Sequence, residues 1–212
     1  MGRPAPSKSP WPSPRPKALP PPINLGRTPG DMWTVEGVLT AEEAAAFIRA
    51  AEGVGFPTPP SGPPQPGMAA RDNARLAWED RALADALWRI LQPSIAASCA
   101  GDAALALGCS PALRLYRYAP GQRFARHYDD AVGGVLGPGT GTRHTVLIYL
   151  SACAGGETVF YGAKGKEVAA VPPAPGRALI HRHGDDCLLH EGARVRDGVK
   201  YVLRTDVVYR ED

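Results

Sequence analysis

The sequence of 212 residues is poor in several features that mark common classes of protein. Its only cysteines are Cys99, Cys109, Cys153 and Cys187. They show no Cys-x-x-Cys spacing and no dense framework, which excludes a disulfide scaffold and indicates free thiols in a reducing compartment. No apolar run is long enough to span a membrane, and no secretory signal begins the chain. We therefore expect an intracellular, cytoplasmic protein with no membrane partner.

Acidic residues are missing from the first thirty positions, which hold ten of the 23 prolines and five basic residues. A stretch of this composition cannot bury apolar surface, so we expect residues 1–30 to form a disordered, Pro-rich basic tail ahead of a folded domain over 31–212. The charge of the tail exceeds the formal net charge of +3 and leaves the domain near −2. The domain therefore offers no basic surface for a nucleic acid. A basic, acid-free leader is also compatible with an organelle transit peptide.

The expected domain divides into a helical part over about 31–110 and a jelly-roll core over about 111–212. Thr40 and Glu43 form a capping box ahead of apolar residues at helical spacing, and a second helix is expected from about Trp78 to Gln92, where a proline interrupts it. Short apolar segments then alternate with Gly and Pro turns. This pattern is typical of an all-β sandwich or a jelly roll, and of the two we expect a mainly β (α+β) fold, a double-stranded β-helix (jelly roll) with buttressing N-terminal helices.

Histidine is scarce, with five in the chain, and His127 stands in a His-x-Asp pair with Asp129. The segment reads as a strand, on which side chains return to the same face every second residue, so the two groups point the same way roughly 6.6 Å apart. One imidazole nitrogen and one carboxylate oxygen can then share a metal ion. With a third ligand from another strand, the set becomes a 2-His-1-carboxylate site that leaves positions open for substrate and O2, as in non-haem Fe(II) oxygenases.

The third metal ligand is expected at His190. A turn at Asp197-Gly198 follows it, and the next segment, 199–209, is rich in β-branched and aromatic residues. This pattern predicts a hairpin that brings Lys200 back beside His190. A cation at that place can bind the distal carboxylate of a chelating 2-oxo acid.

Two alternatives stay open for these assignments. His181 and His183 share one face of a predicted strand and compete as a ligand pair, although they lack the Gly, Val and Lys pattern that follows His190. Arg204 lies four residues beyond Lys200 on the same strand face, roughly 13 Å away, so only one of these cations can anchor a carboxylate. We expect Arg204 to pair instead with Asp206 or another buried acid.

Five ordered segments resemble the 2-oxoglutarate- and Fe(II)-dependent dioxygenases of the prolyl 4-hydroxylase type. The first, residues 114–129, is similar to that family's Tyr-x-x-Gly-Gln-x-aromatic-x-x-His-x-Asp motif. The others are Arg143–Leu150, Gly155–Phe160, Pro175–Ile180 and the stretch from His190 to Lys200, whose spacing of ten is similar to the family's. The resemblance runs from about Trp33 to Tyr209.

The resemblance implies roles that spacing alone does not show. It places the hydroxyls of Tyr118 and Thr158 near 2-oxoglutarate and Arg143 at a substrate-binding cleft. It implies Fe(II) as the metal, 2-oxoglutarate and O2 as co-substrates, and ascorbate as a further small-molecule ligand. The implied reaction hydroxylates an unactivated C–H bond of a peptide, protein or small molecule, with a prolyl residue as one candidate, and releases succinate and CO2. The alternatives are a cupin-like metalloenzyme that does not use 2-oxoglutarate and a non-catalytic jelly-roll binding module.

Overall fold

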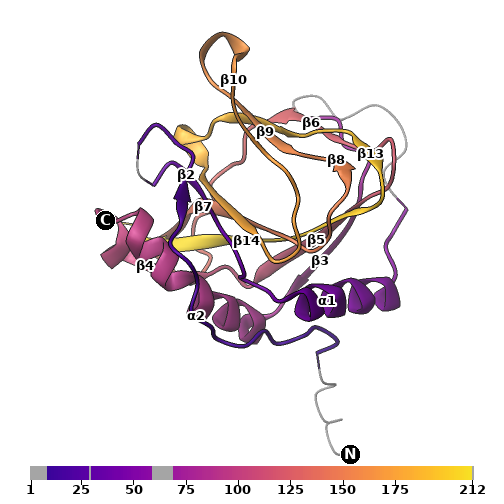
Figure 1. Ribbon diagram of the computed structural model, residues 1–212. Coiled ribbons are helices and arrows are strands. Elements are labelled where there is room, and N and C mark those ends of the chain that lie inside the picture. Colours follow the sequence, from indigo (N-terminus) through magenta and orange to yellow (C-terminus); the bar gives the residue numbers. More distant parts are fainter. Residues whose placement is uncertain (1–8, 29, 59–68, 212) are drawn as a thin grey trace, which may run out of the picture.

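The computed structural model describes residues 9–28, 30–58 and 69–211. Two antiparallel sheets face each other and enclose one part of the apolar core, while two helices cover the outer face of the larger sheet (Figure 1). Tyr118, Tyr149 and Phe160 lie in the core between the sheets. Phe47 and Leu87, from the two helices, lie in the core beneath the larger sheet. The double-stranded β-helix with buttressing helices is confirmed.

The larger sheet has eight strands. Its order is β1 (Ile23–Asn24), β2 (Met32–Val35), β11 (Ala178–Arg182), β7 (Thr140–Tyr149), β14 (Lys200–Arg210), β5 (Ala112–Tyr118) and β3 (Ala74–Glu79), and β4 (Ala106–Cys109) also pairs with β14. The long strands β7 and β14 are paired along almost their whole length. Both strands are nearly fully buried, and they form the centre of the larger sheet, which the smaller sheet faces.

The smaller sheet has the order β10 (Glu167–Val171), β9 (Thr158–Tyr161), β12 (Leu189–Gly192) and β6 (Phe124–His127). A separate two-stranded ribbon joins β8 (Ala154–Gly155) to β13 (Val195–Asp197). In the smaller sheet His190 pairs with His127 on one side and with Phe160 on the other. Two histidines that are 63 residues apart in the sequence are therefore direct neighbours in the smaller sheet.

The first helix, α1 (Ala41–Val54), begins at the expected capping box of Thr40 and Glu43. The second, α2 (Arg81–Ser98), begins after Asp80 and continues through Pro93 instead of ending there. Pro93 is exposed, so water can satisfy the carbonyl that loses its hydrogen bond, while Ser94 and Ile95 just beyond it are buried. Burial beyond the proline thus outweighs its local cost.

The described part of the chain also has three short 3-10 helices, at Ala103–Leu105, Ala163–Gly165 and Gly184–Asp186. Among the described residues, no helix combines the length and apolar character needed to cross a membrane.

The N-terminal stretch differs from the expected disordered tail from residue 9 onward. Trp11 stacks on Trp78 with ring centroids 3.9 Å apart, Lys17 forms an ion pair with Glu43, and β1 adds a strand to the larger sheet. The composition of the stretch disfavours folding on average, but single apolar residues such as Trp11 pack against the core of the domain. Residues 1–8 lie outside the described part of the chain.

Candidate active site

The paired strands β6 and β12 and the residues just beyond β6 bring together three side chains of kinds that can bind a metal ion. His127 Nε2 lies 3.7 Å from Asp129 Oδ1, and His190 Nε2 lies 3.7 Å from Asp129 Oδ2. One ligand atom from each of the three residues falls within 4.8 Å of the others. Two nitrogens and one carboxylate on one side of a common point can hold a metal ion with open positions facing away.

Backbone carbonyls orient both histidines of this triad. His127 Nδ1 donates to Ala125 O at 2.8 Å, and His190 Nδ1 donates to Leu188 O at 2.9 Å. The lone pairs of the Nε2 atoms are thereby turned toward Asp129, the arrangement found around metal-ligating histidines. Burial lowers the pKa of both imidazoles, to about 4 for His190, so they are neutral near pH 7 and available as ligands.

Asp129 is held as a carboxylate by two neighbours that the sequence did not assign to it. Arg204 Nη1 donates to Oδ1 at 2.9 Å, and Thr145 Oγ1 donates to Oδ2 at 2.9 Å. Burial on its own would raise the pKa of Asp129, but the charge of Arg204 and then the nearby histidines lower it well below the usual value. Arg204 also forms an ion pair with Asp206 at 3.2 Å, as expected.

Lys200 lies at the start of β14, directly opposite Tyr118 in the register of the larger sheet. It is 3% exposed, and its ammonium lies over the rings of Tyr118 and Tyr149, 5.2 and 5.6 Å from their centroids. Burial lowers the pKa of Lys200 to about 8. Within the described residues Lys200 forms no ion pair, whereas Arg204 forms two. The two cations therefore differ in role: Arg204 is paired with buried carboxylates, and Lys200 is available to bind an anion.

One small cavity connects the triad to Lys200. Thr158 and Tyr118 lie on its wall, and Thr158 Oγ1 accepts a hydrogen bond from Tyr149 at 2.8 Å. Gly156 packs closely against the side chain of Lys200. Its φ is +71°, and a Cβ atom at this position would lie 3.2 Å from Lys200 Cδ. The cavity is lined by Tyr116, Tyr118, Phe124, His127, Asp129, Leu147, Thr158, His190, Gly192, Lys200, Val202 and Arg204.

Arg143 lies apart from this group. Its guanidinium donates to Arg210 O at 3.3 Å, approaches Asp102 at 3.7 Å and lies over the ring of Tyr209. It lines neither the cavity beside the triad nor the larger cleft described next. The structure thus brings together the predicted ligands, Lys200, Tyr118 and Thr158, but not Arg143.

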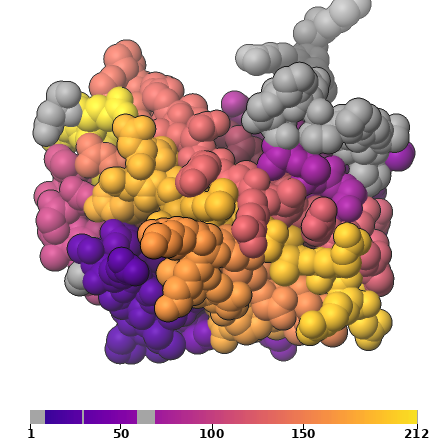
Figure 2. Space-filling view, turned by 90° about the horizontal axis from the view of Figure 1, so that it is seen from above, coloured from indigo at the N-terminus to yellow at the C-terminus, as the bar shows by residue number. Residues whose placement is uncertain are grey.

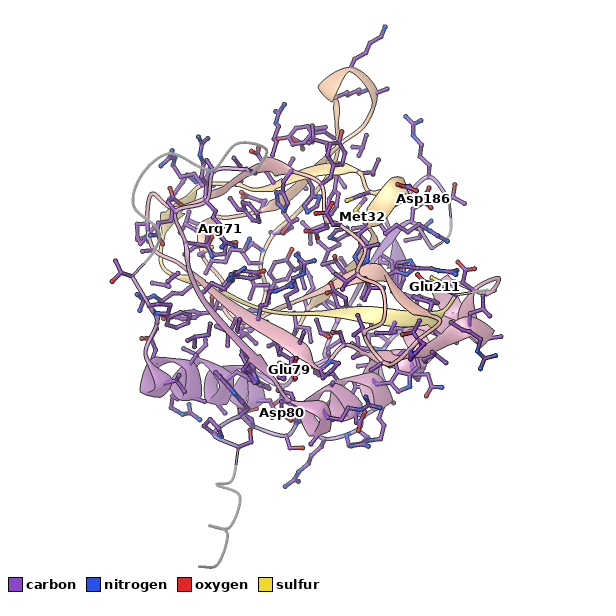
Figure 3. The ribbon with its side chains drawn as sticks, turned by 180° about the vertical axis from the view of Figure 1, so that it is seen from behind. Met32, Arg71, Glu79, Asp80, Asp186 and Glu211 are labelled. Carbon is purple, nitrogen blue, oxygen red and sulfur yellow. The ribbon has the colours of Figure 1, made fainter. Side chains whose placement is uncertain are left out.

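A separate cleft of about 820 Å³ lies next to the β9–β10 hairpin, and none of the three triad residues lines it. Its walls come from the β1–β2 turn, the β9–β10 hairpin, the end of β11 and the segment between β11 and β12, and its lining includes Phe160 and His181. In Figure 2 the indigo N-terminal segment lies beside the orange β9–β10 hairpin on this face, and Figure 3 labels Met32 and Asp186 from its lining. Charges of both signs surround it, with Arg27 and Lys166 among the basic residues.

His181 and His183, the competing pair, have different surroundings. His183 hydrogen-bonds through both ring nitrogens, to Thr145 at 2.9 Å and Thr142 at 2.8 Å, and so supports the residues around Asp129. His181 instead lies beside the triad, with its ring centroid 4.8 Å from that of His190. Strand spacing placed both on one face but did not show that their surroundings differ.

Comparisons with known proteins agree with this geometry. Residues 113–205 match the model of the 2OG-Fe(II) oxygenase superfamily. A viral collagen prolyl hydroxylase from Paramecium Bursaria Chlorella virus-1 is 19% identical with a TM-score of 0.59, over 87% of this chain and 99% of the viral one. A Pseudomonas putida prolyl-4-hydroxylase is 17% identical with a TM-score of 0.59, over 86% and 94% of the two chains. No curated protein matches the sequence.

A prolyl hydroxylase from Trichoplax adhaerens, solved with a peptide fragment of a hypoxia inducible factor, is 15% identical with a TM-score of 0.58 over 84% of this chain and 83% of its own. At such identities these structures show the fold. The family match covers the strands that carry the triad, and it identifies residues 113–205 as a 2-oxoglutarate- and Fe(II)-dependent dioxygenase domain. Its fold is that of the solved prolyl hydroxylases. Its metal is Fe(II), and its co-substrates are 2-oxoglutarate and O2.

Proposed function

We propose that His127, Asp129 and His190 hold Fe(II) and that Lys200 binds the distal carboxylate of 2-oxoglutarate. The observation that carries the proposal is the buried ammonium of Lys200, which has no ion-pair partner among the described residues and shares one cavity with the triad. The donor set fits Fe(II), since two neutral imidazoles and one ionised carboxylate meet there. Bound Fe(II) and 2-oxoglutarate would supply the oxidising power that breaks an unactivated C–H bond, with release of succinate and CO2.

The remaining residues of the cavity position the co-substrate in this proposal. Tyr118 and Thr158 line the space between the triad and Lys200, where their hydroxyls would hydrogen-bond the co-substrate. Arg204 and Thr145 keep Asp129 ionised and fixed in orientation, which keeps its ligand oxygen available. The apolar rings of Phe124 and Tyr116 exclude water from the cavity and so strengthen the attraction between Lys200 and a carboxylate.

We further propose a peptide or protein as the substrate, with a prolyl residue as the site of hydroxylation. Three solved structures of similar fold are those of prolyl hydroxylases, and one of them carries a peptide fragment. The cleft of about 820 Å³, one wall of which is His181 with its ring packed against that of His190, is large enough for several residues of an extended peptide. Its mixed charges can bind polar groups of either sign along such a chain.

The co-substrate assignment is tested by adding Fe(II) and 2-oxoglutarate without oxygen and following the weak visible charge-transfer band of the chelate. We expect the band in the unmodified protein, its loss in His190→Ala, and a much higher 2-oxoglutarate requirement in Lys200→Ala. The matched control is Lys164→Gly, which removes an exposed lysine of the β9–β10 hairpin at a position whose φ of 58° suits glycine. No band in the unmodified protein, or the same band in all variants, would overturn the assignment.

The substrate class is tested separately, by succinate release in the presence of proline-containing peptides. Peptides in which alanine replaces each proline are the matched control, and free small molecules form a third arm. Stimulation by the prolyl peptides alone supports the proposal. If only small molecules stimulate turnover, the prolyl assignment fails while the dioxygenase class stands.

A further inference from the structure

Arginines gather where the last strand of each sheet lies, β3 in the larger sheet and β6 in the smaller. Residues that are directly opposite each other on paired strands project from the same face of a sheet. Arg75 on β3 is opposite Tyr116 on β5. Arg71, just before β3, is opposite Phe124 on β6. Since Tyr116 and Phe124 both line the cavity beside the triad, the two arginines project from the cavity side of their sheets.

A third arginine projects from the same face of the larger sheet. Arg114 on β5 is opposite Ala77 of β3 and opposite Arg204 of β14. Arg204 lines the cavity, so Arg114 is on the cavity side as well. Like charges that are directly opposite on neighbouring strands repel each other, and the carboxylates that Arg204 contacts are already paired with it. The three residues are called the arginine cluster below: Arg71, Arg75 and Arg114.

The arginine cluster has no acidic partner of its own. Among the described residues none of the three forms an ion pair, and the rest of the chain contains one acid, Asp212. Burial lowers the pKa of Arg75, and the charges of Arg71 and Arg114 lower it further, so the three groups are close enough to repel one another. Arg75 is exposed and the other two are half-buried. A cluster of this kind attracts an anionic ligand from solution.

We propose that the arginine cluster binds an acidic side chain of the substrate, a few residues from the one that is hydroxylated. The proposal rests on the peptide substrate of the proposed function. Neighbouring strands are about 4.8 Å apart, so Arg75, two strands from Val202 on the cavity wall, is roughly 10 Å from it. An extended peptide covers that distance with about three residues. Guanidinium groups bind a carboxylate through paired, charge-assisted hydrogen bonds.

The strand order gives such a peptide a path across the site. The large cleft is formed by β2, β11 and the β9–β10 hairpin, at one end of both sheets, and the arginine cluster lies at the other end, on β3 and β5 and beside β6. The triad is between them, on and beside β6 and β12. A peptide with one flank in the cleft therefore has its other flank at the arginine cluster. Three arginines on a domain that is otherwise net acidic fit a carboxylate better than the continuous phosphate backbone of a nucleic acid.

The test compares peptides with one proline and one Glu, placed in turn at each position near that proline, with peptides in which Gln replaces the Glu. Succinate release gives KM, and fluorescence anisotropy with protein loaded with Mn(II) and 2-oxoglutarate gives Kd without turnover. At one or two positions we expect both constants to be about tenfold lower for Glu than for Gln, and the ratio to shrink at high salt.

Substitutions assign the preference to the cluster. The double variant Arg75→Gln/Arg114→Gln should no longer distinguish the two peptides, and Arg75→Glu should prefer Lys to Glu at the same peptide position. The matched control is Arg89→Gln, an exposed arginine of α2 that forms no ion pair with a described residue, and it should keep the preference for Glu.

Equal constants for Glu and Gln at every position in the unmodified protein would overturn the acidic specificity and leave the prolyl substrate in place. That comparison needs no variant to fold. A preference for Glu that survives in the double variant also overturns the proposal. If no peptide binds or is turned over, the peptide substrate and the arginine cluster's role fail together, while the chelate band still decides the metal and co-substrate. An oligonucleotide that binds through these arginines, with no discrimination among peptides, would make the surface a nucleic-acid site instead.

Discussion

At the scale of single residues, the chemistry of the site depends on how each charged group is paired. Asp129 and Lys200 are both buried, yet one is surrounded by donors and the other by aromatic rings. Burial and pairing act on them differently, because the pKa of Asp129 is lowered by Arg204 while the pKa of Lys200 is lowered by burial. As a result, Asp129 is an oriented carboxylate that can bind a metal ion, and Lys200 is a cation that remains available for an anionic ligand.

Replacing Arg204 tests the first of these arrangements. Arg204→Met leaves Asp129 and Asp206 buried without their shared cation, and breaking a buried ion pair from one side typically costs about 3–5 kcal/mol. We expect the free energy of unfolding at pH 7 to fall by about that much, measured by urea denaturation. Arg81→Met removes an exposed ion pair with Asp85 in α2 and should change it little. Equal effects of the two substitutions would contradict this account.

The pKa of Lys200 gives a pH dependence with a definite sign. Burial lowers this pKa to about 8, so the free protein loses the ammonium above pH 8 and must regain a proton to bind a carboxylate. The 2-oxoglutarate dissociation constant, measured by anaerobic titration of the charge-transfer band, should be flat below pH 8 and rise about tenfold per pH unit above it. Lys200→Arg keeps its charge throughout and should bind without this dependence. An equal slope in Lys200→Arg would assign the titration to another group.

At the scale of elements, the register of the smaller sheet decides where the ligands meet. The strands β6, β12 and β9 pair so that His127, His190 and Phe160 lie level across the sheet. A shift of one residue in β12 would turn His190 to the opposite face and separate it from Asp129. The metal site is therefore a property of strand pairing as much as of residue type.

The N-terminal segment is a second element whose contribution is measurable. Trp11→Ala removes the stack on Trp78, and we expect the free energy of unfolding to fall by roughly 1–2 kcal/mol in urea denaturation. Val54→Ala, at the end of α1 and 52% exposed, is the control and should have a much smaller effect. If Trp11→Ala has no larger effect than Val54→Ala, the segment contributes nothing to the stability of the domain.

At the scale of the whole molecule, one barrel carries both the metal site and the co-substrate cavity, so binding there stabilises the entire domain. A ligand at about 100 times its dissociation constant adds about 2.7 kcal/mol, which raises the melting temperature by roughly 5–10 °C for a domain of this size. We expect such a rise with Mn(II) and 2-oxoglutarate in a thermal melt. It should disappear with EDTA and in His190→Ala, and a rise that persists in His190→Ala would place the binding elsewhere.

The sequence predicted those parts of the site that depend on short-range spacing. His127 and Asp129 do lie together, although the strand expected to carry both ends at His127. The expected hairpin is not formed: His190 and Lys200 lie on strands of different sheets and meet across the cavity between them. The capping box at Thr40 was a local pattern, and the structure contains it. Helix α2 and the N-terminal segment differed from expectation because distant contacts, rather than composition, decided them.

By itself the sequence determined the class of chemistry, since residue types and their order along strands already specified two imidazoles, a carboxylate and a cation. Only the tertiary structure decided what surrounds them. Thr145, Tyr149 and His181 come from strands remote from His127 in the chain, and they reach the site because two sheets close face to face. Contacts between sheets have no fixed spacing in sequence, so the carboxylate's partners and the imidazole of His181 beside the triad could be found only in the folded molecule.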